Sequence, residues 1–82
     1  MDMRQIILDA IERIAPDVDV ATLPPDVDFR REAELDSMDF LGVLTKVQET
    51  TGLEVPELDY AQITTIDQFT AYLTSRLPSV GA

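Results

Sequence analysis

Residues 36–52 read DSMDFLGVLTKVQETTG, and this stretch decides the fold. Its apolar residues recur at helical spacing and share an arc of about 160° on a helical wheel, which predicts a helix from about Ser37 to Thr50. Asp36 is a good N-cap for that helix, and Gly52 fits the position just beyond its end, where left-handed residues are common. The apolar stripe, which we expect to be buried, consists of Phe40, Leu41, Val43, Leu44 and Val47.

The segment before this helix has a helical half and an irregular half. From Met3 to Ile14 the apolar residues cluster within about 140° of a wheel, which predicts an amphipathic helix that ends near Pro16. Residues 16–35 contain prolines and aspartates without any period, so we expect a long ordered loop. The aspartates do not match the calcium-loop pattern, and we expect no metal site there. The apolar side chains that could hold this loop to the core are Val18, Val20, Leu23, Val27 and Phe29.

The chain after residue 52 predicts two further helical pieces. An extended link is followed by residues 57–62, which predict one or two helical turns with Leu58 and Ala61 facing inward. Thr65 and Gln68 form a T-x-x-Q capping box, which indicates the start of a last helix. The buried stripe of this last helix is expected to consist of Ile66, Phe69, Leu73 and Leu77.

These elements predict an all-α fold. No segment alternates with a period of two for long enough to suggest a strand. We therefore expect a small four-helix bundle, with three main helices, one short helix and a long loop after the first helix. The length of 82 residues suits one domain, which we place at residues 1–78, with residues 79–82 as a flexible C-terminal tail.

The composition narrows the possible functions. The chain has 16 acidic and 6 basic residues and a formal net charge of −10, which argues against nucleic acid as a partner and disfavours anionic membranes. Proteins with basic surfaces are the expected partners. Since the chain has no cysteine and no histidine, a Ser-His-Asp or Cys-His catalytic unit cannot be built from it. Its apolar runs are too short for a membrane span, and we expect a cytoplasmic monomer.

The candidate for a chemically functional site is the stretch Asp36-Ser37-Met38-Asp39. A serine at the first position of a helix lies beside unpaired backbone N–H groups, which favour negative charge, so a phosphate joined to Ser37 would be stabilised there. The flanking aspartates could help an incoming enzyme to hold a divalent metal ion. On these residues alone, an ordinary helix cap beside an idle serine is the simpler explanation.

The sequence resembles the acyl carrier protein family at three landmarks. Asp36-Ser37-Met38 is similar to the family's D-S-L motif, with methionine in place of the usual leucine. Gly52-Leu53-Glu54-Val55-Pro56 is similar to its extended stretch that ends in proline, and Ile63-Thr64-Thr65-Ile66 to the start of its last helix. The spacing between these landmarks matches the family, and the resemblance covers roughly residues 3–77.

The resemblance implies a carrier rather than an enzyme. Ser37 would be the attachment point of 4′-phosphopantetheine, which a phosphopantetheinyl transferase adds from coenzyme A. The thiol at the end of that arm would carry acyl groups as thioesters to the enzymes of fatty-acid, specialised lipid or polyketide synthesis. The expected partners are acyl-transferring, ketosynthase or acyl-ligase enzymes with basic patches. A peptidyl or aminoacyl carrier, or an unmodified acidic helical adaptor, is the alternative function.

The resemblance also implies a recognition face on the Ser37 helix. Met38 lies outside the apolar stripe, so it is either an exposed contact for partners or folded onto the long loop. Gly42 and Lys46 make this helix less acidic than the family pattern, which favours a specialised carrier unless the two positions simply tolerate change. The partner-binding residues are expected to be Asp36, Met38, Asp39, Gly42, Lys46 and Glu49.

The apolar stripes are candidates for sheltering a bound acyl chain. At helical spacing these residues are first of all an ordinary core, and both interpretations stay open at this point. The candidate pocket residues are Leu41, Val43, Leu44, Val47, Ile63, Ile66 and Phe69.

Overall fold

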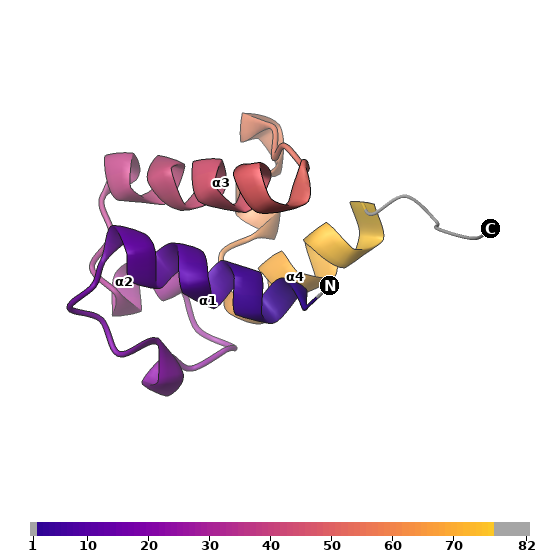
Figure 1. Cartoon of the computed structure of the whole chain (residues 1–82). Helices are drawn as coiled ribbons and strands as arrows, with labels where there is room; N and C mark the ends of the chain where they lie inside the picture. The colour runs from indigo at the N-terminus through magenta and orange to yellow at the C-terminus, as the bar shows by residue number, and fades with distance from the viewer. Residues whose placement is uncertain (1, 77–82) are drawn as a thin grey trace.

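A computed structural model describes residues 2–76 and confirms the predicted helical bundle (Figure 1). Within these residues there is no strand, and an isolated bridge joins Asp28 to Thr65. The expected end of the last helix at Pro78 and the tail at residues 79–82 lie outside the described residues. Three long helices form the bundle: α1 (Met3–Ile14), α3 (Ser37–Thr51) and α4 (Ile66–Arg76). The shorter elements are η1 (Val20–Thr22), α2 (Phe29–Glu32) and η2 (Glu57–Gln62).

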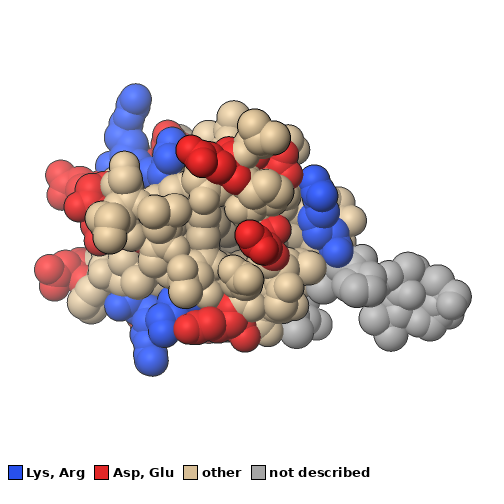
Figure 2. Space-filling model, turned by 90° about the horizontal axis from the view of Figure 1, so that it is seen from above, with Lys and Arg blue, Asp and Glu red and all other residues tan. Residues whose placement is uncertain are grey.

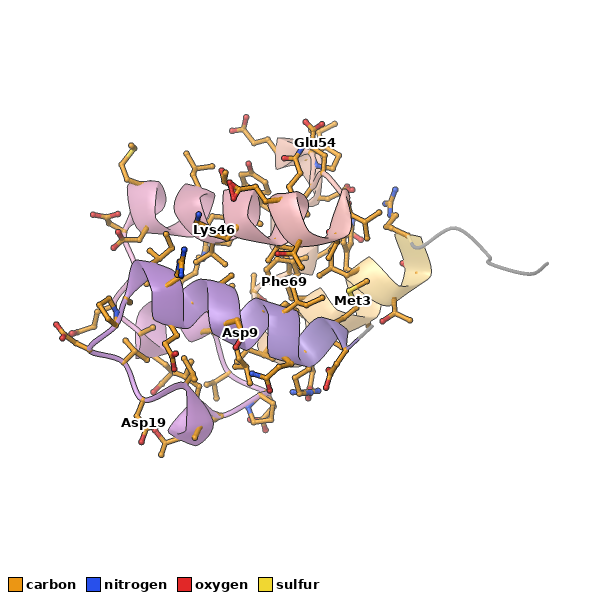
Figure 3. The ribbon with its side chains drawn as sticks, in the orientation of Figure 1. Met3, Asp9, Asp19, Lys46, Glu54 and Phe69 are labelled. Carbon is orange, nitrogen blue, oxygen red and sulfur yellow. The ribbon has the colours of Figure 1, made fainter. Side chains whose placement is uncertain are left out.

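The core lies between the three long helices and is organised around one aromatic cluster. The ring of Phe29 is fully buried and stacks against Phe69 of α4, with centroids 6.0 Å apart and an interplanar angle of 25°. On its other side the same ring meets Phe40 of α3 at 6.2 Å. Figure 3 shows Phe69 in the space between α1 and α3. One short helix therefore supplies the side chain that α3 and α4 share.

The segment at residues 16–35 is ordered, as expected, but it is not free of regular structure. Two short helices form in it because aspartate side chains cap them: Asp19 accepts from the backbone of Ala21, and Asp28 accepts from the backbone N–H groups of Arg30 and Arg31. Of the apolar residues expected to anchor the segment, Phe29 is fully buried and the other four are partly buried. Helices of three and four residues are too short to produce a detectable apolar period.

Residues 57–62 are helical, but the predicted inward face was wrong. Leu58 is 94% exposed and Ala61 is also exposed, whereas Tyr60 is half-buried. The segment is a 3₁₀ helix with about three residues per turn, so an α-helical wheel assigns its faces incorrectly.

Asp59 ties this short helix to α4. Its Oδ2 accepts hydrogen bonds from the Tyr72 hydroxyl at 2.6 Å and from Arg76 Nη2 at 3.2 Å. Burial raises the pKa of the Tyr72 hydroxyl above its usual value, the hydrogen bond to Asp59 raises it further, and the nearby charge of Arg76 opposes both effects. The contact adds a polar attachment to the apolar one that Tyr60 makes, whereas Leu58 of the same helix is exposed.

Gly42 lies where α3 approaches α1. A Cβ atom at this position would lie 2.9 Å from Ile14 Cδ1 and 3.4 Å from Ile14 Cγ1. An unstrained Cβ contact is longer than this, so Ile14 would have to move if a side chain were added. The glycine therefore has a packing reason, which the interpretation of position 42 as a missing charge did not consider.

This contact predicts non-additive stability changes for Gly42→Ala and Ile14→Val. Alanine is a better helix former than glycine by about 1 kcal/mol, but in the wild-type background part of that gain is offset by displacing Ile14 Cδ1. In the Ile14→Val background the obstructing methyl group is absent, so the alanine should give its full gain of about 1 kcal/mol. Urea unfolding of the two single variants and the double variant measures both gains. Equal gains in the two backgrounds would mean that Ile14 does not constrain position 42.

Candidate functional site

The site is the junction at which α3 begins. Asp36 caps the helix: its Oδ1 accepts from the backbone N–H of Asp39 at 2.8 Å, and Asp39 Oδ2 accepts from the backbone N–H of Asp36 at 3.4 Å. This reciprocal capping box confirms the predicted N-cap. Ser37 is the first residue of the helix and is exposed, and no hydrogen bond within residues 2–76 uses its hydroxyl. The hydroxyl is thus free to react at a helix end that favours negative charge.

A strained turn brings the chain to this junction. Glu34 has a φ of 55°, in the left-handed region that favours glycine. It ends α2 with two backbone hydrogen bonds, from Leu35 N–H to the carbonyl of Arg30 at 2.8 Å and from Glu34 N–H to the carbonyl of Arg31 at 3.2 Å. A non-glycine residue in this conformation costs about 1 kcal/mol. The end of α2 and the start of α3 are therefore close together in the sequence. Only Leu35 separates the left-handed residue Glu34 from the N-cap Asp36.

Two surface hollows flank Ser37. One has a volume of about 310 Å³ and lies between α3 and η2, and the other, of about 570 Å³, lies beside α2. Arg30 borders both hollows. Besides Ser37 and Arg30, the first is lined by Phe40, Leu41, Glu57 and Tyr60. The second is completed by Asp28, Arg31, Glu34, Leu35 and Asp36.

Aromatic contacts shape the hollow between α3 and η2. Tyr60 meets the ring of Phe40 edge-on, with centroids 5.3 Å apart and planes at 88°. The guanidinium carbon of Arg30 lies over the same ring, 4.7 Å from its centroid. The sequence interpretation missed Arg30, Glu57 and Tyr60 as neighbours of Ser37. A tyrosine within the predicted short helix was a signal available in the sequence, but the position of Arg30 depends on tertiary structure alone.

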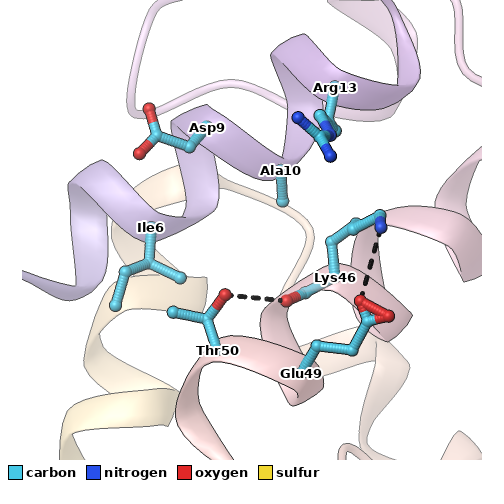
Figure 4. A pocket seen from close by; sticks show the side chains of 7 residues that line it. All are labelled: Ile6, Asp9, Ala10, Arg13, Lys46, Glu49 and Thr50. Carbon is cyan, nitrogen blue, oxygen red and sulfur yellow. Dashed lines mark hydrogen bonds and ion pairs between the residues drawn. The ribbon is translucent and has the colours of Figure 1, made fainter.

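The residues expected to bind partners along α3 have different surroundings. Met38 is 76% exposed, so it is not folded onto the long loop, and its role as a contact for partners stays a prediction. Gly42 faces Ile14 of α1, and Lys46 and Glu49 lie on the same flank of α3. Figure 4 shows Lys46 and Glu49 opposite Ala10 and Arg13 of α1, around a hollow of about 310 Å³. Lys46 Nζ donates to Glu49 Oε2 at 3.3 Å, so its charge is partly balanced within the helix.

The residues expected to form an acyl pocket are also divided. Leu41 was predicted to belong to the buried stripe, but it is 44% exposed and lines the hollow beside Ser37. It lies at the edge of the apolar arc, where η2 does not cover it. Leu44 is partly buried. The other five, which are buried in the core, are Val43, Val47, Ile63, Ile66 and Phe69.

Comparison with known proteins gives a consistent result. Residues 4–73 match the family described as "Phosphopantetheine attachment site". The chain belongs to the acyl carrier protein family. It is 32% identical over 73 residues to an acyl carrier protein of Rubrobacter xylanophilus, an alignment that covers 85% of this chain and 90% of that protein. No solved structure gives a significant match.

Of two further relatives, one has a name that gives its pathway and the other does not. An acyl carrier protein of Lactobacillus johnsonii is 30% identical over 64 residues, which cover 78% of each chain. The Polyketide-8 synthase acyl carrier protein 2 of Streptomyces avermitilis is 27% identical over 75 residues, which cover 92% of this chain and 80% of that one. The relatives therefore agree on the carrier family and leave the pathway open.

Members of this family are generally non-catalytic and carry a covalently attached 4′-phosphopantetheine, whose thiol holds the acyl group. They work with biosynthetic enzymes and a phosphopantetheinyl transferase. The free, exposed hydroxyl of Ser37 and the open space on both sides of it fit such an attachment. None of the helices within residues 2–76 is both long enough and apolar enough to cross a membrane.

The capping box predicts different effects for two substitutions of Asp36. Asp36→Ala removes the acceptor for the Asp39 N–H and should lower the free energy of unfolding by about 1 kcal/mol. Asp36→Asn removes the same charge but keeps an acceptor, so it should lower the free energy by only a few tenths of a kcal/mol. Urea unfolding of both variants measures the difference. If asparagine costs as much as alanine, charge at the helix end matters more than the hydrogen bond.

Proposed function

We propose that Ser37 carries the phosphopantetheine arm and that the protein delivers acyl groups, as thioesters, to enzymes of fatty-acid or polyketide synthesis. On attachment, Ser37 Oγ forms a bond to the phosphorus of the pantetheine half of coenzyme A, and the adenosine bisphosphate half leaves. The transferase takes up the hydroxyl proton. The observation that carries the proposal is the free serine hydroxyl at the start of α3, inside the region that matches the family.

The composition supports a carrier whose reactive group is supplied by the arm. The chain itself has neither cysteine nor histidine, so the reactive sulfur has to come from the arm. What the protein supplies is a fixed position for the attachment and a surface that its enzymes recognise. The name of one relative supports polyketide enzymes as recipients, and the other names leave the recipient open. The close approach of Gly42 to Ile14 offers a packing explanation for one of the two departures that favoured a specialised carrier.

Attachment can be tested by mass. Incubation with coenzyme A and a broad-specificity phosphopantetheinyl transferase should add the mass of one phosphopantetheine to the wild-type protein and to Ser75→Ala. Ser75 is a matched control, because its hydroxyl caps a carbonyl of α4 far from the junction. Ser37→Ala should gain nothing while keeping the wild-type circular dichroism. An unmodified wild-type protein, or a modified Ser37→Ala, would exclude Ser37 as the attachment site.

Partner enzymes dock on the apolar surface next to Ser37. Three large apolar side chains are exposed within residues 2–76: Met38, Leu41 and Leu58. Met38 follows Ser37 directly in the sequence, and Leu41 and Ser37 line the same hollow. Figure 2, which views the molecule from the side of α3, shows a broad uncharged area with charged side chains around it. A basic patch on an enzyme would meet Asp39 and Glu57 at the margin of this surface.

Truncation of Met38 should weaken recognition without weakening the fold. Because the side chain is 76% exposed, Met38→Ala should leave the free energy of unfolding nearly unchanged. The KM of the transferase for the protein should rise roughly 5- to 30-fold, which corresponds to about 1–2 kcal/mol for a central apolar contact. Gln48→Ala is the control on the same helix and should change KM less than twofold. Equal KM values for both variants would place the docking surface elsewhere.

A further inference from the structure

We infer that the guanidinium of Arg30 binds the phosphodiester of the arm on Ser37 and so fixes the direction in which the arm leaves the protein. This inference rests on the proposed function, in which Ser37 bears the arm. It assigns a positioning role to a residue of α2 that lies seven positions before the serine in the sequence.

The aromatic contact of Arg30 places its guanidinium near Ser37. Arg30 Cζ lies 4.7 Å from the ring centroid of Phe40, and Phe40 follows Ser37 by three residues on α3. Residues three apart on a helix are surface neighbours, with Cβ atoms about 5–6 Å apart. Helical side chains also lean toward the N-terminus of their helix, so the Phe40 side chain is directed toward the turn that contains Ser37. In agreement, Arg30 and Ser37 together line both flanking hollows.

The charges around Ser37 favour a cation at this place. A phosphodiester carries one negative charge, and carboxylates already surround the junction: Glu34 and Asp36 line one hollow and Glu57 lines the other. The helix end compensates only part of that repulsion. The basic residues that line the hollows are Arg30 and Arg31. The other cations with ion pairs in the described residues line neither hollow: Arg4 and Arg76 lie on other helices, and Lys46 pairs with Glu49 farther along α3.

The N–H groups of the Arg30 guanidinium are available to a new acceptor. Its Nε lies 3.9 Å from Asp28 Oδ1, which is longer than a hydrogen bond, and within residues 2–76 its guanidinium donates no hydrogen bond. The planar fork of an arginine can bind two phosphate oxygens at once. Since the Phe40 ring already holds the guanidinium in place, binding loses less side-chain entropy than it would for a freely moving arginine.

Arg31 provides a natural comparison. It is adjacent in sequence and carries the same charge, but it is exposed, lines only one of the two hollows and does not stack on Phe40. If general electrostatic attraction were sufficient, the two arginines would act alike. If the stacked geometry matters, only Arg30 will hold the phosphate.

The experiment compares the phosphorus NMR resonance of holo proteins. Wild type, Arg30→Gln, Arg31→Gln and Arg30→Lys are loaded with phosphopantetheine, and mass spectrometry of the peptides locates the arm. In the wild type the resonance should be displaced from its position in the urea-unfolded holo protein. Arg30→Gln should move it most of the way to the unfolded position, Arg31→Gln should leave it near the wild-type position, and Arg30→Lys should give an intermediate value.

A second measurement needs no substitution. The guanidinium Nε–H resonance of Arg30 should shift between the apo and holo wild-type proteins, whereas that of Arg31 should not. Equal phosphorus shifts for Arg30→Gln and Arg31→Gln, or an Arg30 resonance that does not respond to the arm, would overturn the role of Arg30 and leave the proposed function intact. An arm located on a residue other than Ser37 would overturn both.

Discussion

The packing of Phe29 against both Phe40 and Phe69 is the contact on which the rest of the structure depends. It joins the loop segment, α3 and α4 through a single fully buried side chain. Because α2 is anchored by this ring, the left-handed turn at Glu34 and the cap at Asp36 follow at fixed positions. The serine at the start of α3 is therefore placed by the core, although the serine itself is exposed.

The functional junction combines a rigid base with an accessible surface. Two helix-end motifs meet within three residues, and they pair the backbone N–H groups of Leu35, Asp36 and Asp39 on either side of Ser37. The side chains around Ser37 are more accessible than that backbone. Met38 and Leu41 are exposed, and Arg30 lies over the ring of Phe40. A carrier has to be recognised by several enzymes, and this arrangement offers them apolar area and charge without requiring the helix start to move.

The long helices were predictable because their apolar periods extend over three or four turns. The bounds of the first helix, Met3 and Ile14, agree with the structure, and α3 ends one residue later than expected. The prediction of burial was wrong for Leu58, which lies in a short 3₁₀ helix, and for Leu41, which lies at the edge of the apolar stripe of α3. The serine was recognisable through its motif. The hollows around it were not, because their walls come from α2 and η2, whose positions depend on packing between distant segments.

The core has one further property that bears on its mechanical behaviour. Every buried residue in the described part of the chain is apolar, apart from the hydroxyl of Tyr72, which donates a partly buried hydrogen bond to Asp59. Sliding one helix past another would break no buried hydrogen bond, and the resistance to it would come from close packing alone. Such an interior is deformable in a way that a polar core is not. An apolar guest that entered it would replace the contacts it displaced with contacts of the same kind.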